Sequence, residues 1–175
     1  MLGKNNIGKL LEMFFNNPRK EFHIRELSRM TDISAPTILL AVKELEKLKL
    51  INTHKKGNLK IAKASLSIEF FHAKRVRNLQ MLYESSLVNY LSNLYENPKA
   101  IVLFGSFSRG DDVETSDIDI AVITNMEKKS DLKLFEKKFG KKISIHEINI
   151  KEISKEFYSN LINGIVVEGA LHERF

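Results

Sequence analysis

The chain has 175 residues, no cysteine, 43% hydrophobic residues and a formal net charge of +6. This composition is that of a folded protein with one or two small cores, and it excludes disulfides, thiolate zinc sites and cysteine nucleophiles. The sequence has no apolar run of about 18 residues, and its start has an amphipathic helix pattern rather than that of a signal peptide, so we expect a cytoplasmic protein without membrane contact.

Positive charge is concentrated in the first part of the chain. Residues 1–97 contain 16 Lys and Arg against 9 Asp and Glu, whereas residues 98–175 contain 12 against 13. A basic excess confined to one part of a chain favours nucleic-acid binding, although a lysine-rich surface gives the same count. The asymmetry indicates two domains.

The N-terminal pattern predicts three short helices. Apolar residues at helical spacing stop at 16–18, which ends the first helix, and a short strand over 21–24 leads into a second helix over 24–30. Ser34 caps the third helix, with Pro36 in its first turn. Its buried stripe is expected to comprise Ile38, Val42, Leu45 and Leu48. Helix, turn and helix follow at a spacing suited to DNA docking.

Two strand-like segments, 50–54 and 59–62, come next and are joined by Lys55-Lys56-Gly57-Asn58. Gly-Asn between two β runs indicates a hairpin, and lysines at its tip can reach phosphates. The segments from Asn5 to Ala64 resemble the winged helix-turn-helix of MarR- and ArsR-like prokaryotic regulators. The resemblance implies binding of double-stranded DNA, for which the candidate contacts are Thr37, Lys43, Lys47, Lys55 and Lys56.

Leu39 and Leu40 stand at outward positions early in the third helix. Base edges are read mainly by hydrogen bonds, so contact with phosphates is better supported than base-specific readout. Dimerisation, or packing on the second domain, remains an alternative use of this fold.

The segment 67–97 is strongly helical, with a break expected at Ser85-Ser86. Its first part is interpreted as a connecting or dimer helix. We therefore expect three parts: a DNA-binding domain over 1–66, a helical linker over 67–86, and a second domain over 87–175.

Gly105-Ser106 lies between two predicted strands and upstream of paired carboxylates. The apolar run 101–104 is typical of a buried strand that ends in a tight turn, and 118–123 predicts a second strand. Residues two apart on a strand share a face, so Asp117 and Asp119 are expected to project together beside the turn. Mg²⁺ is usually held by one or two carboxylates and the substrate's own phosphates. The pattern predicts a site for a metal-bound triphosphate.

Three flanking residues fit the same site. Arg109 can bind a phosphate through its guanidinium group, Gly110 is expected to close the helical turn that Ser106 opens, and Ser116 precedes the carboxylates. The alternative is a Gly-Ser turn followed by a solvated acidic loop.

The pattern GS-x10-DxD within GSFSRGDDVETSDIDIAV resembles the minimal nucleotidyltransferase domain of the polymerase-beta superfamily, over Leu87 to Phe175. The resemblance implies that the two aspartates are catalytic and bind Mg²⁺ or Mn²⁺. It also implies that the substrate or ligand is an NTP, with ATP expected. The residues assigned to the nucleotide are Gly105, Ser106, Arg109, Gly110 and Ser116.

The family pattern also has a third carboxylate on a later strand. The matching segment, 142–148, places Ser144 at that position, and strand alternation puts the nearest acid, Glu147, on the opposite face. His146 shares the face of Ser144 and could take a proton, although such a histidine is more often structural. The missing acid affects the expectation of catalysis more than that of nucleotide binding.

The remaining elements alternate between helices and strands. A helix over 130–139 ends at Gly140, and a strand over 143–150, a helix over 152–163 and a strand or turn over 164–169 follow. We expect an α+β protein whose second domain is a small α/β nucleotidyltransferase fold with a mixed sheet.

Two functions fit the sequence. The first is transfer of NMP from NTP to an acceptor hydroxyl, coupled to DNA binding; resemblance to antitoxin-like members keeps a partner protein, such as a helical toxin, as a candidate acceptor. The second is a transcriptional regulator whose degenerate nucleotidyltransferase domain only binds nucleotide. A homodimer is compatible with both.

Overall fold

The computed structural model describes residues 6–150 and 152–171. The described chain is a mixed α and β protein that divides into two compact units, Met1–Lys74 and Arg75–Phe175. No helix in the described part combines the length and the hydropathy that a membrane span requires. The boundary between the units falls inside a helix, and the domain limits expected from the sequence stay a prediction.

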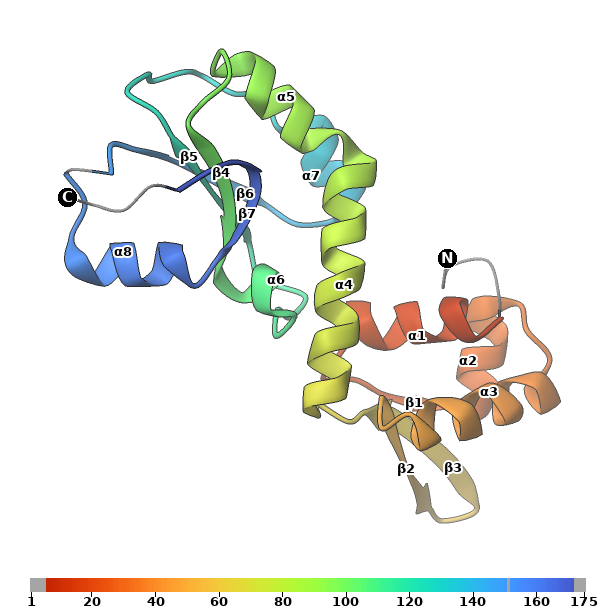
Figure 1. Ribbon diagram of the computed structural model, residues 1–175. Coiled ribbons are helices and arrows are strands. Elements are labelled where there is room, and N and C mark those ends of the chain that lie inside the picture. The colour runs from red at the N-terminus through yellow and green to blue at the C-terminus, as the bar shows by residue number, and fades with distance from the viewer. Residues whose placement is uncertain (1–5, 151, 172–175) are drawn as a thin grey trace. The chain divides into compact units, whose positions relative to one another are not determined.

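The first unit consists of three helices and a three-stranded antiparallel sheet (Figure 1). The strands lie in the order β1-β3-β2. The elements are α1 (Asn6–Asn16), β1 (Glu21–His23), α2 (Ile24–Thr31), α3 (Ala35–Lys47), β2 (Ile51–Lys56) and β3 (Leu59–Ala64). All of these elements were expected from the sequence, with small differences at their ends.

Helix α3 begins and ends for identifiable reasons. The Ser34 side chain accepts a hydrogen bond from the backbone N–H of Thr37, which confirms the expected cap. The helix ends at Lys47, and Leu48, expected in the buried stripe, is 55% exposed. That expectation was wrong because Leu48 lies beyond the last helical residue, where the helical periodicity no longer directs its side chain inward. In the β2–β3 hairpin, Gly57 has a positive φ of 60°.

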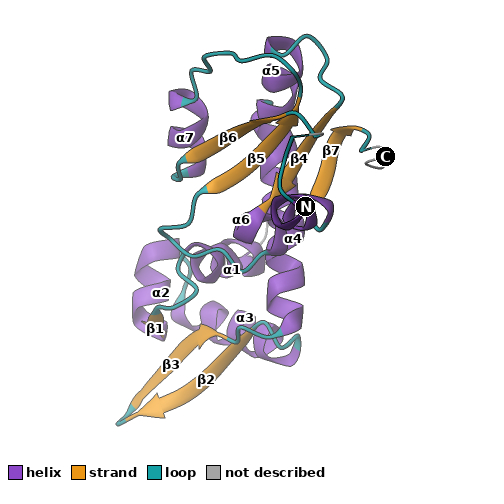
Figure 2. Ribbon diagram, turned by 90° about the vertical axis from the view of Figure 1, so that its left-hand side faces the viewer, coloured by secondary structure: helices purple, strands orange, loops and turns teal. Residues whose placement is uncertain are grey.

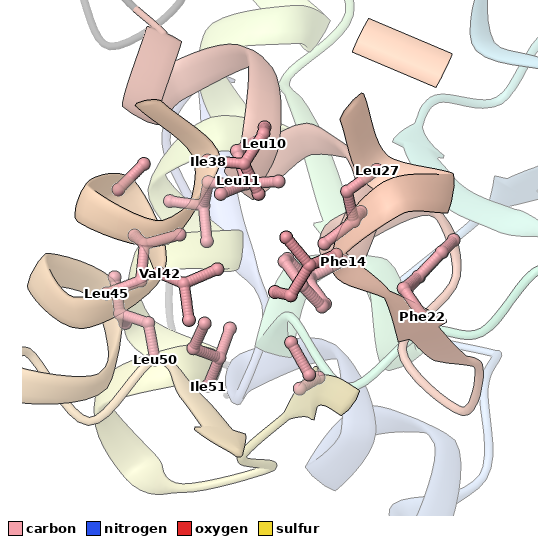
Figure 3. Close-up of a cluster of buried hydrophobic side chains, with 14 of the residues drawn as sticks. Leu10, Leu11, Phe14, Phe22, Leu27, Ile38, Val42, Leu45, Leu50 and Ile51 are labelled. Atoms are coloured by element: carbon pink, nitrogen blue, oxygen red, sulfur yellow. The ribbon is translucent and has the colours of Figure 1, made fainter. Parts of the chain in front are cut away.

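The core of the first unit is formed by side chains from all three helices and the sheet (Figure 3). The rings of Phe14 and Phe22 meet edge to face with centroids 5.4 Å apart, and both side chains are fully buried. The labelled members of this cluster in Figure 3 are Leu10, Leu11, Phe14, Phe22, Leu27, Ile38, Val42, Leu45, Leu50 and Ile51. This core fixes α3 and the hairpin as one scaffold.

A long helix, α4 (Ile68–Ser85), contains the boundary between the units. It ends at the expected break, where Ser86 has a positive φ of 66°. The second unit then consists of α5 (Leu87–Leu94), β4 (Ala100–Phe104), α6 (Gly105–Arg109), β5 (Ile118–Ile123), α7 (Lys133–Phe139), β6 (Ile143–Ile148), α8 (Lys155–Ile162) and β7 (Ile165–Gly169). Helices α7 and α8 are shorter than expected, and β6 ends two residues early.

The four strands of the second unit form a mixed sheet in the order β6-β5-β4-β7 (Figure 2). Strands β5 and β6 are parallel, whereas β4 is antiparallel to both β5 and β7. Figure 1 shows α5 and α7 on one face of this sheet and α8 on the other. Apolar side chains bury both faces: Ile118, Ile120 and Val122 of β5 face one cluster, and Ala121 and Ile123 face the other. The α8 face also carries Asp119, by strand alternation.

Candidate functional site

The turn that leaves β4 is built against the start of β5. Gly105 has a positive φ of 72°, and Phe104 pairs with Asp119 in the sheet register. A Cβ atom built on Gly105 would overlap the carboxylate of Asp119 and would lie 3.2 Å from its Cγ. A side chain at position 105 is therefore excluded by backbone conformation and by space. The backbone of the turn lies directly against an acidic side chain.

The short helix α6 holds the rest of the turn in place (Figure 1). The N–H of Gly110 donates to the carbonyl of Ser106 at 2.9 Å with Gly110 at a φ of 81°, which confirms that Gly110 closes the turn. The buried hydroxyl of Ser108 donates to the carbonyl of Gly105 at 2.8 Å. Ser106 itself is partly exposed.

Arg109 is exposed and forms an ion pair with Asp111, with 3.2 Å between Nε and Oδ2. Exposed pairs of this kind contribute at most about 1 kcal/mol, so the Arg109 side chain is free to exchange Asp111 for a phosphate at little cost. Its assignment to the nucleotide remains a prediction.

The two aspartates lie at the start of β5. Asp117 is exposed and directly precedes the strand, and Asp119 is its second residue, with a side chain that is 31% exposed. No group of three or more His, Asp or Glu side chains in the described residues is arranged to hold a metal ion. Two carboxylates at the start of β5, of which Asp119 lies against the backbone of the turn, suit Mg²⁺ or Mn²⁺ that brings phosphate oxygens as further ligands. The donor set fits a metal–nucleotide complex better than a metal bound by protein alone.

Ser116 acts within the loop that leads to the aspartates. Its Oγ accepts a hydrogen bond from the N–H of Val113 at 3.0 Å, and its own N–H donates to the carbonyl of Val113 at 3.0 Å. The hydroxyl assigned to the nucleotide is thus engaged in shaping the loop, and its nucleotide role stays a prediction.

Ser144 lies on the strand beside Asp119, at the position where the family resemblance implies a third carboxylate. Ser144 pairs with Asp119 in the parallel register of β5 and β6. Glu147 lies on the other face, where its Oε1 accepts hydrogen bonds from the hydroxyl of Tyr95 at 2.6 Å and from the N–H of Lys128 at 2.7 Å. Burial, with the hydrogen bond to Glu147, raises the pKa of Tyr95 above its ordinary value. Glu147 is therefore committed to the α5 side of the sheet and is not a substitute for the missing acid.

His146 lies on the same face as Ser144 and beside Asp119. Its Nε2 is 3.7 Å from Oδ1 of Asp119 and is buried without a hydrogen-bond partner among the described residues. The imidazole packs against Phe104 and Phe157, with ring centroids 5.2 and 6.0 Å away. The aromatic packing fixes the ring next to the acidic site.

Three polar residues were missed by the sequence reasoning: Asn78 and Asp112, which are buried, and Lys141, whose side chain is 12% exposed. Asp112 lies in the loop that precedes β5, and Asn78 and Lys141 contact that loop. Their partners are 25 to 34 residues away in sequence, so no local pattern could have identified them.

In the first unit, the residues expected to contact DNA lie on α3 and the hairpin. Lys43, Lys47, Lys55 and Lys56 are exposed, whereas the Thr37 hydroxyl is 2.8 Å from that of Ser34 at the helix cap. A groove of about 690 Å³ lies between α2, α3 and the hairpin, and its lining includes further basic residues that the sequence reasoning missed: Arg25, Arg29 and Lys60. Leu39 also lines it.

Comparisons with known proteins address the second unit. Residues 85–171 match the family model described as Polymerase beta, Nucleotidyltransferase. No curated protein matches the chain. The matched segment contains the Gly105 turn, both aspartates and all four strands of the mixed sheet. Residues 85–171 are therefore similar to nucleotidyltransferase domains of the polymerase beta type.

Proposed function

We propose that the chain is a Mg²⁺- or Mn²⁺-dependent nucleotidyltransferase that moves NMP from an NTP, with ATP as the expected substrate, to an acceptor hydroxyl. The observation that carries this proposal is the contact between the Gly105 backbone and the Asp119 carboxylate, inside a segment that matches a nucleotidyltransferase family model. A turn open to phosphate and a metal-binding carboxylate are needed at the same place for this reaction, and here they adjoin.

The residues of the site fall into two groups, one for the phosphates and one for the metal. The Gly105-Ser106 backbone and the exposed Arg109 bind the phosphates, while Asp117 and Asp119 hold the metal. A metal ion bound there would neutralise the negative charge that develops on the phosphates. In transfer, the acceptor hydroxyl gives up its proton to water and its oxygen forms a bond to the α-phosphorus, while the bond from the α-phosphorus to the oxygen that bridges it to the β-phosphorus breaks, so that pyrophosphate leaves.

The first unit is proposed to be a winged helix-turn-helix that binds double-stranded DNA, with α3 and the β2–β3 hairpin facing the duplex. Support comes from its element order, the exposed lysines and the basic groove beside α3. Residues 1–74 carry 14 Lys and Arg against 7 Asp and Glu, an excess that favours contact with phosphates. The acceptor is proposed to be a partner protein, of which a helical toxin is one candidate, and the location is proposed to be cytoplasmic.

A second function, nucleotide binding without transfer by a transcriptional regulator, is favoured by one observation. Ser144 stands beside Asp119 where the family resemblance implies a third carboxylate, and Glu147 is held on the opposite face. A missing acid removes a candidate base for the acceptor hydroxyl while leaving the phosphate turn and both aspartates in place. In that case nucleotide binding alone would alter the DNA affinity of the chain, or of its homodimer.

Incorporation of label from α-phosphate-labelled NTPs separates these functions. The purified chain is incubated with each of the four labelled NTPs and Mg²⁺ or Mn²⁺, with and without the proteins that co-purify from its native host. Transfer predicts label on a protein band that is lost in Asp119→Ala. Saturable nucleotide binding without incorporation would instead select the regulator.

A further inference from the structure

The loop over residues 111–117 carries Asp117 to the start of β5 and has no regular secondary structure apart from a single turn. Its internal bonds are few, the main one being the pair between Val113 and Ser116. A short polar loop of this kind is mobile unless other elements hold it. The position of Asp117 relative to Asp119 therefore depends on what the loop contacts.

Lys141, just before β6, reaches across to this loop. Its ammonium group donates to the carbonyl of Val113 and, at 3.4 Å, to the carbonyl of Ser116, and it forms an ion pair with Asp112 at 3.2 Å. All three acceptors belong to the loop. The Lys141 side chain is only 12% exposed, so these interactions are little weakened by water.

Asn78 of α4 also holds the loop. Its side-chain amide donates to Oδ1 of Asp112 at 2.8 Å and to the carbonyl of Phe107 at 3.0 Å. Asn78 is fully buried and Asp112 is 2% exposed. A buried carboxylate is retained in a fold only where such donors and charges compensate its desolvation. Asp112 thus links the loop both to α4 and to Lys141.

The backbone next to Lys141 is hydrogen-bonded to the start of β5. The N–H of Ile118 donates to the carbonyl of Lys142 at 2.9 Å, next to the first paired residues of β5 and β6. Lys141 follows Gly140, the left-handed cap of α7, which fixes where its side chain departs. The backbone of Lys141 is therefore held between α7 and β6, while the groups that accept from its ammonium group lie on the loop.

We infer that Lys141 is a positioning residue of the candidate site: through Asp112 and the carbonyls of Val113 and Ser116, it fixes the loop that places Asp117 beside Asp119. This inference rests on the proposed function for its consequence in metal–nucleotide binding. Its structural part, the ordering of the loop, does not depend on that function. Lys141 acts through the loop.

The test compares Lys141→Met with two variants. Lys142→Met removes the same charge from the exposed neighbouring side chain and is the matched control, and Lys141→Arg keeps the charge and the donors. Hydrogen exchange of the 111–117 amides is measured first, well below the melting temperature. The Mg²⁺ concentration for half-maximal ATP binding is then measured by calorimetry.

Lys141→Met is expected to speed exchange in the loop without changing exchange in β4. It should also raise the Mg²⁺ requirement by at least about tenfold, the factor that 1.4 kcal/mol represents. Lys141→Arg should recover part of both properties, and Lys142→Met should behave as the unmodified protein. Loss of stability alone would not shift the Mg²⁺ requirement of the folded protein.

Unchanged hydrogen exchange in the loop of Lys141→Met would overturn the inference. Faster exchange with an unchanged Mg²⁺ requirement would also overturn it. So would the same faster exchange and higher Mg²⁺ requirement in Lys142→Met. If the unmodified protein binds no Mg²⁺–ATP, the proposed function fails, and the exchange result still decides whether Lys141 orders the loop. Should Lys141→Met not fold, the isosteric Asp112→Asn variant removes the charge from the other side of the pair and is judged by the same exchange criteria.

Discussion

Gly105 and Asp119 are in direct contact across the end of the β4–β5 pair, and no side chain fits between them. The glycine lets the backbone turn with a positive φ, and the same lack of a Cβ leaves the Asp119 carboxylate in place. The phosphate turn and the acidic site are thus one structural unit, and changes to either residue should affect both.

Gly105→Ala is expected to abolish Mg²⁺-dependent ATP binding and to lower the free energy of unfolding more than a positive φ alone explains. Gly57→Ala is the matched control, because Gly57 has a φ of 60° but nothing within 4 Å of a built Cβ. Strain from a left-handed alanine costs about 1–2 kcal/mol, so the control should lose that amount and keep its binding. Denaturant unfolding measures the free energy of unfolding, and calorimetry measures ATP binding. Equal losses of unfolding free energy in both variants would contradict an overlap between a Cβ at position 105 and the Asp119 carboxylate.

Ser144→Asp should distinguish a transferase from a nucleotide-binding regulator. The new carboxylate would lie beside Asp119 on β6 and would add a metal ligand or a base at the position where the family resemblance implies one. A working site should transfer NMP faster, by about a hundredfold or more. Ser144→Asn adds the same bulk without charge and is the control. An equal change in both variants would show that bulk, rather than the acid, matters.

Replacing Lys55 and Lys56 with alanine should weaken binding to double-stranded DNA. Both side chains are exposed at the end of β2. If each contacts one phosphate, the slope of log K against log salt should fall in magnitude by about 2. Lys9→Ala, at an exposed position on α1, should leave the slope unchanged. Fluorescence anisotropy over a series of salt concentrations gives the slopes, and an unaltered slope in the hairpin variant would argue against contact at this tip.

Tyr95→Phe tests the bond that holds Glu147 away from the site. Burial and the hydrogen bond to Glu147 raise the pKa of Tyr95, so the folded protein holds this proton more tightly than the unfolded chain. The contribution of the Tyr95 proton to the free energy of unfolding is therefore complete below the ordinary tyrosine pKa of about 10. This contribution is lost as the pH rises above that value. The variant should lose about 1.5–3 kcal/mol of unfolding free energy at neutral pH.

The alkaline loss of stability should also be smaller in Tyr95→Phe than in the unmodified protein. Tyr83→Phe is the control and should retain the alkaline loss; Tyr83 is 54% exposed, and its hydroxyl donates to the carbonyl of Val167. Urea unfolding measured from pH 7 to 11 provides the comparison. Identical pH profiles for Tyr95→Phe and the unmodified protein would contradict the assignment.

The parts of the site that follow from local rules were predictable from sequence. An apolar run ending in Gly-Ser gives β4 and the turn, and the two-residue strand period correctly placed Glu147 opposite Ser144. The expected cap at Ser34 and the closing role of Gly110 follow from equally local chemistry.

Features that depend on distant residues were not predictable. The contacts of Lys141 with Asp112 and its neighbours join segments 25 or more residues apart. Lys141 lies outside the motif, and Asp112 stands at one of the ten unspecified positions of GS-x10-DxD. The exposure of Leu48 depends on where α3 stops, because one residue past the end suffices to remove it from the buried stripe. The sequence indicates which chemistry is present, whereas the buried polar network becomes visible only with the fold.

A metal–nucleotide site at Gly105, Asp117 and Asp119 is tested by calorimetric titration of Mg²⁺–ATP into the unmodified protein, Asp117→Ala, Asp119→Ala and the control Glu114→Ala. Glu114 is exposed in the same loop, so its removal changes the charge without removing a proposed ligand. Mg²⁺-dependent binding should be abolished in both aspartate variants and retained in Glu114→Ala. Unchanged binding in the aspartate variants would contradict a metal–nucleotide site at Gly105 and Asp119.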